Sequence, residues 1–233
     1  MKKFAVMVLA GMLVVAFTMP AAALENVFGG YWRTRIFTNQ NFDGHDRDNN
    51  EGGMEDITQA NTRTRIYYTA ILNDNLKFVN KFEMDAVWGN NESGGKYGDI
   101  GADGIGFEVK NSYVDFTIGA MNAKVGVQGG ALARGLIFDD DFSGAKVTFG
   151  GGGVSVPITW IKAFDEDTAT NKRDVDYFIV SPTFGGGGFS INPFGMYVFS
   201  DNASEWEKTD TYNDMNMWYG GLEMKINTDP LSF

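Results

Sequence analysis

A two-residue alternation of apolar and polar side chains limits the folds open to this chain, and it is clearest in residues 76–88. The apolar positions there are Leu76, Phe78, Phe82, Met84, Ala86 and Trp88, and the charged ones between them are Lys77, Lys81, Glu83 and Asp85. Successive side chains of a β-strand point to opposite faces, whereas helical spacing would mix the two sets. The segment therefore predicts a strand with one apolar and one polar face.

Similar segments recur along the chain and predict ten strands. They cover residues 27–38, 62–72, 76–88, 106–118, 123–128, 145–149, 154–164, 175–184, 189–200 and 216–226. The predicted connections alternate strictly between long and short. Outer-membrane barrels have this asymmetry, with long extracellular loops and tight periplasmic turns. A soluble β-sandwich also alternates its faces, but it has no reason to confine long loops to one end. The pattern favours an all-β, transmembrane, antiparallel up-and-down β-barrel.

The amino terminus has the features of a secretory signal peptide. Lys2 and Lys3 precede an apolar run over residues 4–18, and Ala21-Ala22-Ala23 supplies small residues for cleavage. The run is shorter than the ~20 residues of a membrane-spanning helix. We expect residues 1–23 to be a signal peptide, in preference to an uncleaved anchor, and residues 24–233 to form the exported domain.

Composition narrows the class of partner. Beyond the signal peptide the chain has 17 basic and 30 acidic residues, a net charge of −13. This balance argues against nucleic acid, which requires a basic face. The absence of cysteine excludes disulfides and thiolate metal sites. The chain is also rich in aromatic residues, with 19 Phe, 9 Tyr and 5 Trp. Many of them fall near the predicted strand ends, as in the interfacial girdles of membrane barrels, although cross-strand aromatic pairs of a soluble core are the alternative.

The arrangement resembles that of Gram-negative general porins. The resemblance rests on the signal peptide, the stretches Tyr31-Trp32-Arg33-Thr34-Arg35 and Arg63-Thr64-Arg65, and residues 125–130 leading to 135–142. It extends over essentially the whole exported chain, as a likeness of pattern without a diagnostic motif. Such porins typically have sixteen strands and form trimers, so the resemblance implies a homotrimer and a chain that ends before its last strands. A complete ten-stranded barrel is the alternative.

The alternation also assigns the side chains that would line a pore. If the apolar faces contact lipid, the intervening charged side chains face the lumen, because charge on the lipid face costs about 2–4 kcal/mol at mid-membrane. Four arginines on two neighbouring strands then form what we call the basic wall. The predicted pore-lining residues are Arg33, Arg35, Arg63, Arg65, Lys77, Lys81, Glu83 and Asp85.

The resemblance implies a constriction loop as well. In general porins the third long loop folds into the barrel and narrows it, and here that loop corresponds to residues 129–144. Its charged residues are Arg134, Asp139, Asp140 and Asp141. The aspartates would then face the basic wall across the pore. The alternative is a solvated loop edge that binds a cation in passing.

Two further patterns in the first long loop give little support for a metal site or for catalysis. Asp46, Asp48 and Asn50 fit the first positions of a calcium loop, but Glu51 replaces the turn glycine and Ile57 the final glutamate. A solvated acidic loop is the preferred interpretation, and we predict no metal site. The single histidine, His45, lies in the same loop, so catalysis has little support and we expect no enzyme.

The predicted function is passive diffusion of small hydrophilic solutes or ions through a water-filled barrel in the cell outer membrane. No cofactor is implied, and the partners are outer-membrane lipid and the solutes themselves. The principal alternative is a barrel that binds a surface partner through its long acidic loops. An outer-membrane hydrolase is a more distant alternative.

Overall fold

The computed structural model describes residues 24–39, 57–90, 98–101, 106–167, 172–201 and 215–226, and almost all of them are in strands. The strands are β1 (Glu25–Asn39), β2 (Ile57–Asn73), β3 (Leu76–Val87), β4 (Phe107–Ile118), β5 (Met121–Leu132), β6 (Phe138–Gly151), β7 (Val154–Asp167), β8 (Lys172–Val180), β9 (Thr183–Gly186), β10 (Phe189–Asp201) and β11 (Met215–Ile226). One 3₁₀ turn, η2 (Ala133–Gly135), lies between β5 and β6. The predicted signal peptide, the acidic loop with His45 and the carboxyl-terminal residues lie outside the described ranges.

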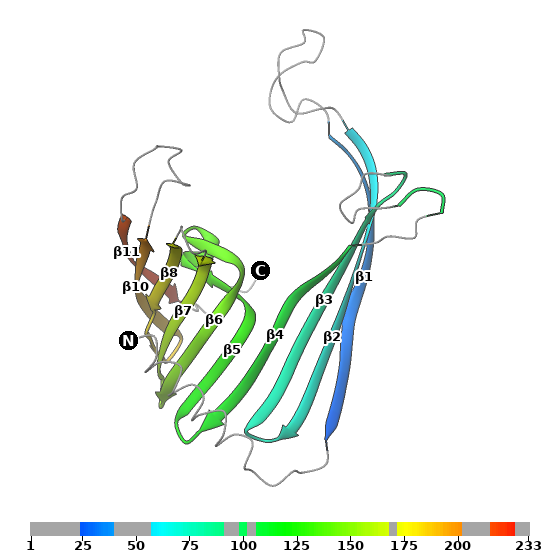
Figure 1. The fold of residues 1–233 in the computed structure, drawn as a ribbon. Helices are drawn as coiled ribbons and strands as arrows, with labels where there is room; N and C mark the ends of the chain where they lie inside the picture. The colour runs from blue at the N-terminus through cyan, green and yellow to red at the C-terminus, as the bar shows by residue number, and fades with distance from the viewer. Residues whose placement is uncertain are drawn as a thin grey trace. The chain divides into compact units, whose positions relative to one another are not determined.

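The strands form one antiparallel sheet, drawn in Figure 1, in which the strand order follows the sequence from β1 to β8 and then β10 and β11. The short strand β9 pairs with β7 and β10 beside this path. Each of the other strands therefore pairs with its neighbour along this path, as expected of up-and-down topology. The all-β, antiparallel prediction is confirmed.

The chain divides into two compact units, and strands β1, β2, β3 and β4 contribute to both. The first unit contains the described residues of 1–26, 69–79 and 111–233, and the second contains those of 27–68 and 80–110. We refer to them as the first and second units.

The short connections are confirmed, and glycine explains most of them. β4 and β5 are joined by a turn at Gly119, β6 and β7 by Gly152-Gly153, and β9 and β10 by Gly187-Gly188. All five glycines have a positive φ between 58° and 91°, which residues with a side chain rarely adopt. The Asp74-Asn75 turn between β2 and β3 is instead supported by the Asn73 side chain, which accepts a 2.8 Å hydrogen bond from the Asn75 backbone.

The predicted bounds of two long connections are wrong, because both connections are shorter than expected. The β5–β6 ladder continues to the pair Leu132–Phe138, so the connection is the segment 133–137 and not 129–144. The β7–β8 ladder continues to Asp167–Lys172, past the predicted loop start at residue 165. In both places polar and glycine residues suggested a loop, but a two-stranded ladder satisfies the backbone hydrogen bonds of such residues as well. Polarity alone therefore does not end a strand.

The predicted eighth strand is divided in the structure, so the described residues form eleven strands where the sequence predicts ten. β8 ends at Val180, and β9 begins at Thr183 after Ser181-Pro182. Pro182 has no backbone N–H to donate, so the ladder is interrupted there. The Asn192 side chain donates 2.8 Å hydrogen bonds to the carbonyl oxygens of both interrupting residues. The carbonyl groups at the break are thus hydrogen-bonded within the sheet.

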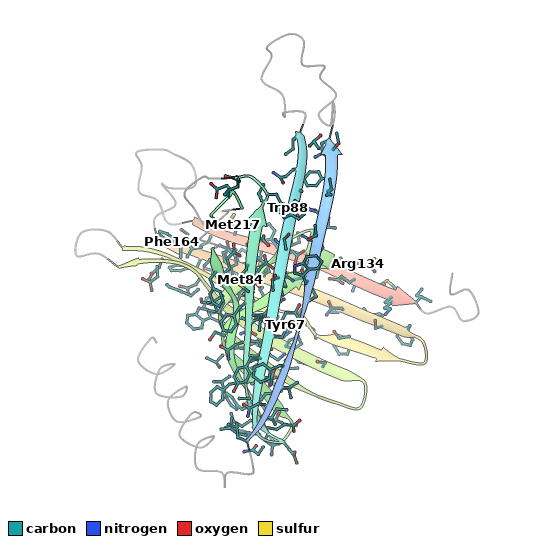
Figure 2. All side chains as sticks on the ribbon, turned by 90° about the vertical axis from the view of Figure 1, so that its right-hand side faces the viewer. Tyr67, Met84, Trp88, Arg134, Phe164 and Met217 are labelled. Carbon is teal, nitrogen blue, oxygen red and sulfur yellow. The ribbon has the colours of Figure 1, made fainter. Side chains whose placement is uncertain are left out.

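One face of the sheet is apolar and exposed in each unit. In the second unit, Phe28, Trp32 and Ile36 alternate with polar residues along β1, and Trp88 (Figure 2) lies on the same face because its indole donates a 2.9 Å hydrogen bond to Thr62. The exposed apolar residues of the first unit include Phe149, Ile158, Trp160, Phe178, Val180, Phe184, Phe189, Trp218, Leu222, Met224 and Ile226. We call this side of each unit the apolar face and the opposite side the polar face. Among the described residues, no helix is long and apolar enough to span a membrane.

A pair of glycines marks the place where the β5–β6 hairpin leaves the sheet. Gly126 of β5 pairs with Gly144 of β6, and shortly beyond them β5 stops pairing with β4 and β6 stops pairing with β7. A methyl group on Gly144 would clash with the Trp160 carbonyl oxygen, and one on Gly126 with the Ser112 carbonyl oxygen. Glycine is required here because the neighbouring backbones approach too closely for a side chain.

We therefore predict that Gly144→Ala lowers the free energy of unfolding by about 1–3 kcal/mol, the usual cost of forcing extra volume into a packed site. Gly151→Ala in the same strand is the control, because its added methyl group meets no atom within 4 Å. Its cost should stay within about 0.5 kcal/mol. Urea unfolding followed by tryptophan fluorescence measures both changes, and equal losses would contradict the close approach at Gly144.

Candidate functional site

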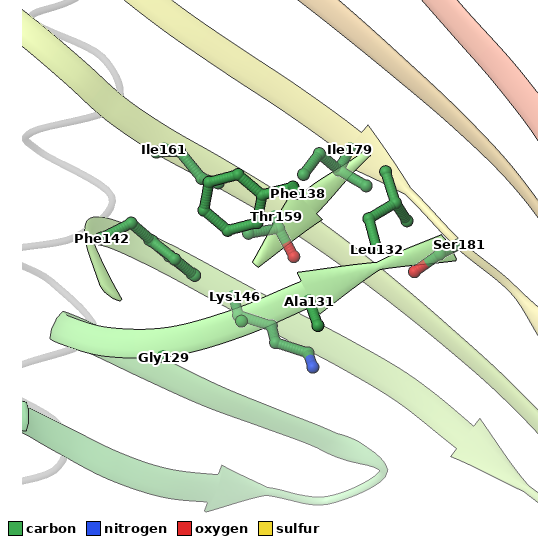
Figure 3. A pocket seen from close by; sticks show the side chains of 11 residues that line it. Gly129, Ala131, Leu132, Phe138, Phe142, Lys146, Thr159, Ile161, Ile179 and Ser181 are labelled. Carbon is green, nitrogen blue, oxygen red and sulfur yellow. The ribbon is translucent and has the colours of Figure 1, made fainter. Parts of the chain in front are cut away.

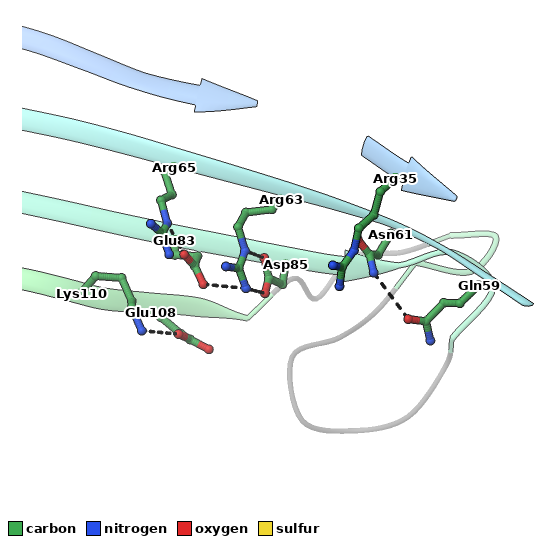
Figure 4. A network of polar contacts seen from close by, with 9 residues as sticks. All are labelled: Arg35, Gln59, Asn61, Arg63, Arg65, Glu83, Asp85, Glu108 and Lys110. Carbon is green, nitrogen blue, oxygen red and sulfur yellow. Dashed lines mark hydrogen bonds and ion pairs between the residues drawn. The ribbon is translucent and has the colours of Figure 1, made fainter. Parts of the chain in front are cut away.

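The polar face of the second unit contains an ion-pair network between β2 and β3 (Figure 4). Arg63 binds Asp85 through two hydrogen bonds, 2.7 Å from Nε to Oδ1 and 2.5 Å from Nη2 to Oδ2, and it lies 3.0 Å from Glu83. Arg65 forms a further ion pair with Glu83. The side chain of Glu83 is only 4% exposed, so its charge depends on these two guanidinium groups.

Aromatic rings extend the same face. The Arg65 guanidinium lies over the Tyr31 ring at 5.5 Å from its centroid, and the Lys81 ammonium lies over the Tyr67 ring at the same distance. Both distances are typical of cation–π interactions. These interactions keep the long cationic side chains extended along the sheet surface. The face therefore presents cations in an ordered arrangement.

The remaining two arginines of the basic wall differ from Arg63 and Arg65. Arg35 donates a 3.0 Å hydrogen bond from Nε to the Asn61 side chain. Arg33 has a buried Nε without a hydrogen-bond partner. Neither guanidinium forms an ion pair with a carboxylate in the described part of the chain. The basic wall thus consists of two neutralised arginines and two that retain a net charge.

We predict unequal effects of neutralising the two carboxylates of this network. Glu83→Gln should lower the free energy of unfolding by about 3 kcal/mol, because it leaves two arginines beside a buried, uncharged amide. Asp85→Asn is the matched control, since that side chain is 38% exposed and its loss should cost about 1 kcal/mol. Urea unfolding of both variants tests the difference. A larger loss for Asp85→Asn would overturn the central place given to Glu83.

The polar face of the first unit contains a lysine cluster, which we define as Lys77, Lys124 and Lys146. Lys77 and Lys124 share the buried carboxylate of Asp115, at 3.3 and 3.9 Å. Asn122 donates a 2.7 Å hydrogen bond to the same carboxylate. Of the lysines, only Lys77 was predicted as a functional residue. The alternation of Lys124 with its apolar neighbours in β5 already indicated its face, but the sequence did not reveal Asp115 as its partner.

The β5–β6 hairpin beyond Gly126 and Gly144 packs over the polar side of the sheet (Figure 3). Leu132 and Phe142 are buried in a cluster with residues of β7, β8 and β10, and Phe138 packs against it. These partner residues alternate with members of the exposed apolar face, so the hairpin covers the opposite side. The buried partners are Ile161, Val175, Ile179, Met196 and Val198.

The charged residues of this hairpin are not in a long loop, which corrects the prediction for residues 129–144. Asp139, Asp140 and Asp141 belong to β6, and Arg134 belongs to the short turn η2. In the ladder, Asp139 and Asp141 pair with Ala131 and Gly129, so they alternate with the buried side of the hairpin. The side chains of Asp139 and Asp141 therefore point away from the cluster that holds the hairpin down.

The tip of the hairpin is tied to the last described strand. Ala133, Arg134 and Gly135 all have positive φ values, of 54°, 55° and 87°. This tight reversal places the Arg134 guanidinium 3.2 Å from the Met224 carbonyl oxygen of β11, to which it donates a hydrogen bond. Apolar packing and this polar contact together hold the hairpin over the sheet.

We predict that Leu132→Ala loosens the hairpin. Removing a buried leucine side chain costs about 2–5 kcal/mol, and Leu132 is 5% exposed. Leu136→Ala is the matched control, because this leucine lies in the turn of the same hairpin and is 88% exposed. Limited proteolysis should cleave the hairpin faster in the Leu132 variant only. Equal cleavage of the two variants would contradict the role given to the buried cluster.

The described residues include no group of three or more His, Cys, Asp or Glu side chains that could hold a metal ion.

No protein-family model matches this chain, and no curated protein matches it.

Proposed function

We propose that this protein is an outer-membrane porin, which allows small hydrophilic solutes or ions to diffuse passively through a water-filled barrel. The proposal includes export by the amino-terminal signal peptide, insertion into the outer membrane and assembly of a closed barrel of the general-porin type. No cofactor or energy source takes part. The lipid of the membrane and the diffusing solutes are the proposed partners, together with further copies of the chain in a homotrimer.

The observation that carries the proposal is the exposed apolar face. Large side chains such as Trp218, which is 76% exposed, recur at alternate positions along strands of 12 residues or more. A soluble monomer rarely exposes contiguous apolar surface of this kind. Each Å² of apolar surface left in water lacks about 25 cal/mol of the stabilising free energy that burial would provide. A membrane strand needs only about 9–11 residues to cross the hydrocarbon, so these strands are long enough.

The polar face supports a water-filled interior. It carries the ion pairs of Arg63, Arg65, Glu83 and Asp85, and the lysine cluster around Asp115. Charged groups of this density require water, since isolated charges are strongly disfavoured in a medium of low dielectric constant. Fixed charges along a pore select among ions by their sign.

The proposal predicts channels whose ion selectivity depends on the basic wall. The full chain, inserted into a planar bilayer under a potassium chloride gradient, should give stable conductance steps. Arg33→Gln should shift the reversal potential toward cation preference, because it removes a guanidinium without an ion-pair partner among the described residues.

Lys162→Gln is the matched control, because it removes one positive charge from the other side of the sheet. Lys162 pairs with Asp176 on the same side as Trp160 and Phe178, which belong to the apolar face. Its loss should leave the reversal potential unchanged. A folded, membrane-inserted protein without conductance would overturn the porin proposal, and equal shifts in both variants would overturn the assignment of the two faces.

A further inference from the structure

The lysine cluster has more positive charge than its surroundings neutralise. Lys124 lies directly opposite Asp115 on one side and directly opposite Lys146 on the other, in the registers of β4–β5 and β5–β6. Side chains directly opposite each other in antiparallel strands have Cβ atoms about 4.5–5.5 Å apart. Two ammonium groups are therefore held on neighbouring strands, and like charges in this position are destabilising.

One carboxylate serves the three lysines. Asp115 contacts Lys77 and Lys124, and Lys146 forms no ion pair with a described residue. Asp115 is almost fully buried and is fixed by Asn122, so it cannot move to balance Lys146 as well. The cluster keeps an excess of two positive charges on one part of the polar face.

The structure also leaves space beside these charges. A hollow next to Lys124 is lined by Asn111, Tyr113, Gln128 and Gly129. A second hollow, under the hairpin, is lined by Lys146 and Thr159 and also reaches Gly129 (Figure 3).

The groups around the first hollow suit an anion. The Lys124 ammonium lies 5.5 Å from the Tyr113 ring centroid, which keeps this side chain over the face. Lysine ammonium groups bind phosphate and carboxylate oxygens as compact charges that need no fixed geometry.

We propose that Lys77, Lys124 and Lys146 form a binding site for small oxyanions, of which inorganic phosphate is the simplest. The bound anion offsets the repulsion between Lys124 and Lys146 and occupies the hollow beside Lys124. This inference rests on the proposed pore and adds the class of solute that the pore retains. The basic wall does not contribute to it.

Binding is tested first without any channel measurement. Phosphate is titrated into the full chain, folded in detergent micelles, and binding is followed by isothermal calorimetry. Lys146→Gln should raise the dissociation constant at least about tenfold, as expected for the loss of one charge-assisted contact. Lys146 has no ion pair to lose among the described residues, so this variant removes no counter-charge from the fold. Lys124→Gln is the second variant and should act in the same direction.

Lys225→Gln is the matched control. Lys225 lies on β11, is exposed, and pairs in register with Ser190 away from the cluster, so its loss changes the net charge equally. Its dissociation constant should change less than about twofold. Equal weakening in all three variants, or no phosphate binding to the unaltered protein, overturns the site.

The same proteins in a planar bilayer separate the two proposals. Millimolar phosphate should reduce the chloride current of the unaltered channel, and Lys146→Gln should relieve this inhibition. Open channels on which phosphate acts equally in both proteins overturn the site and leave the pore intact. Phosphate binding in micelles without any conductance overturns the pore and leaves the site intact.

Discussion

A β-strand turns successive side chains to opposite faces, and this geometric constraint underlies every other feature of the protein. With the strands of the main path paired antiparallel to their neighbours, the constraint gives each unit one apolar and one polar face. The backbone hydrogen bonds of the paired strands are satisfied within the ladders, so the character of each face is decided by its side chains. A shift of one residue in register would move the charged side chains of a strand to the wrong face.

The β5–β6 hairpin shows how a local departure from regular pairing changes the polar face. At Gly126 and Gly144 the two strands approach their neighbours closely and then leave them. Leu132 and Phe142 can then be buried against the sheet, and each contributes about 1.5–3 kcal/mol through burial. The hairpin is thus held by apolar contacts on one side and presents Asp139 on the other.

The net charge at each place on the polar face depends on local ion pairing and not on which sign of charge predominates along a strand. Glu83 and Asp85 neutralise Arg63 and Arg65, whereas Arg33 has no such partner among the described residues. In the first unit, Asp115 takes the same role for two lysines and leaves Lys146 without a carboxylate. The net charge around a residue therefore depends on its neighbours across the strand as well as on its own charge.

The strand class, most strand positions, the short glycine turns and the alternation of charged with apolar residues along β3 follow from the sequence alone, because they depend on a period of two and on local backbone preferences. The extent of the β5–β6 ladder does not, because polar residues are compatible with both a loop and an exposed hairpin. The sequence also did not show which residues Arg63, Lys124 and Arg134 contact, because those partners depend on the strand pairing. Those contacts join residues up to 90 positions apart, and they are set by the tertiary structure, since cross-strand register brings together side chains that the sequence separates.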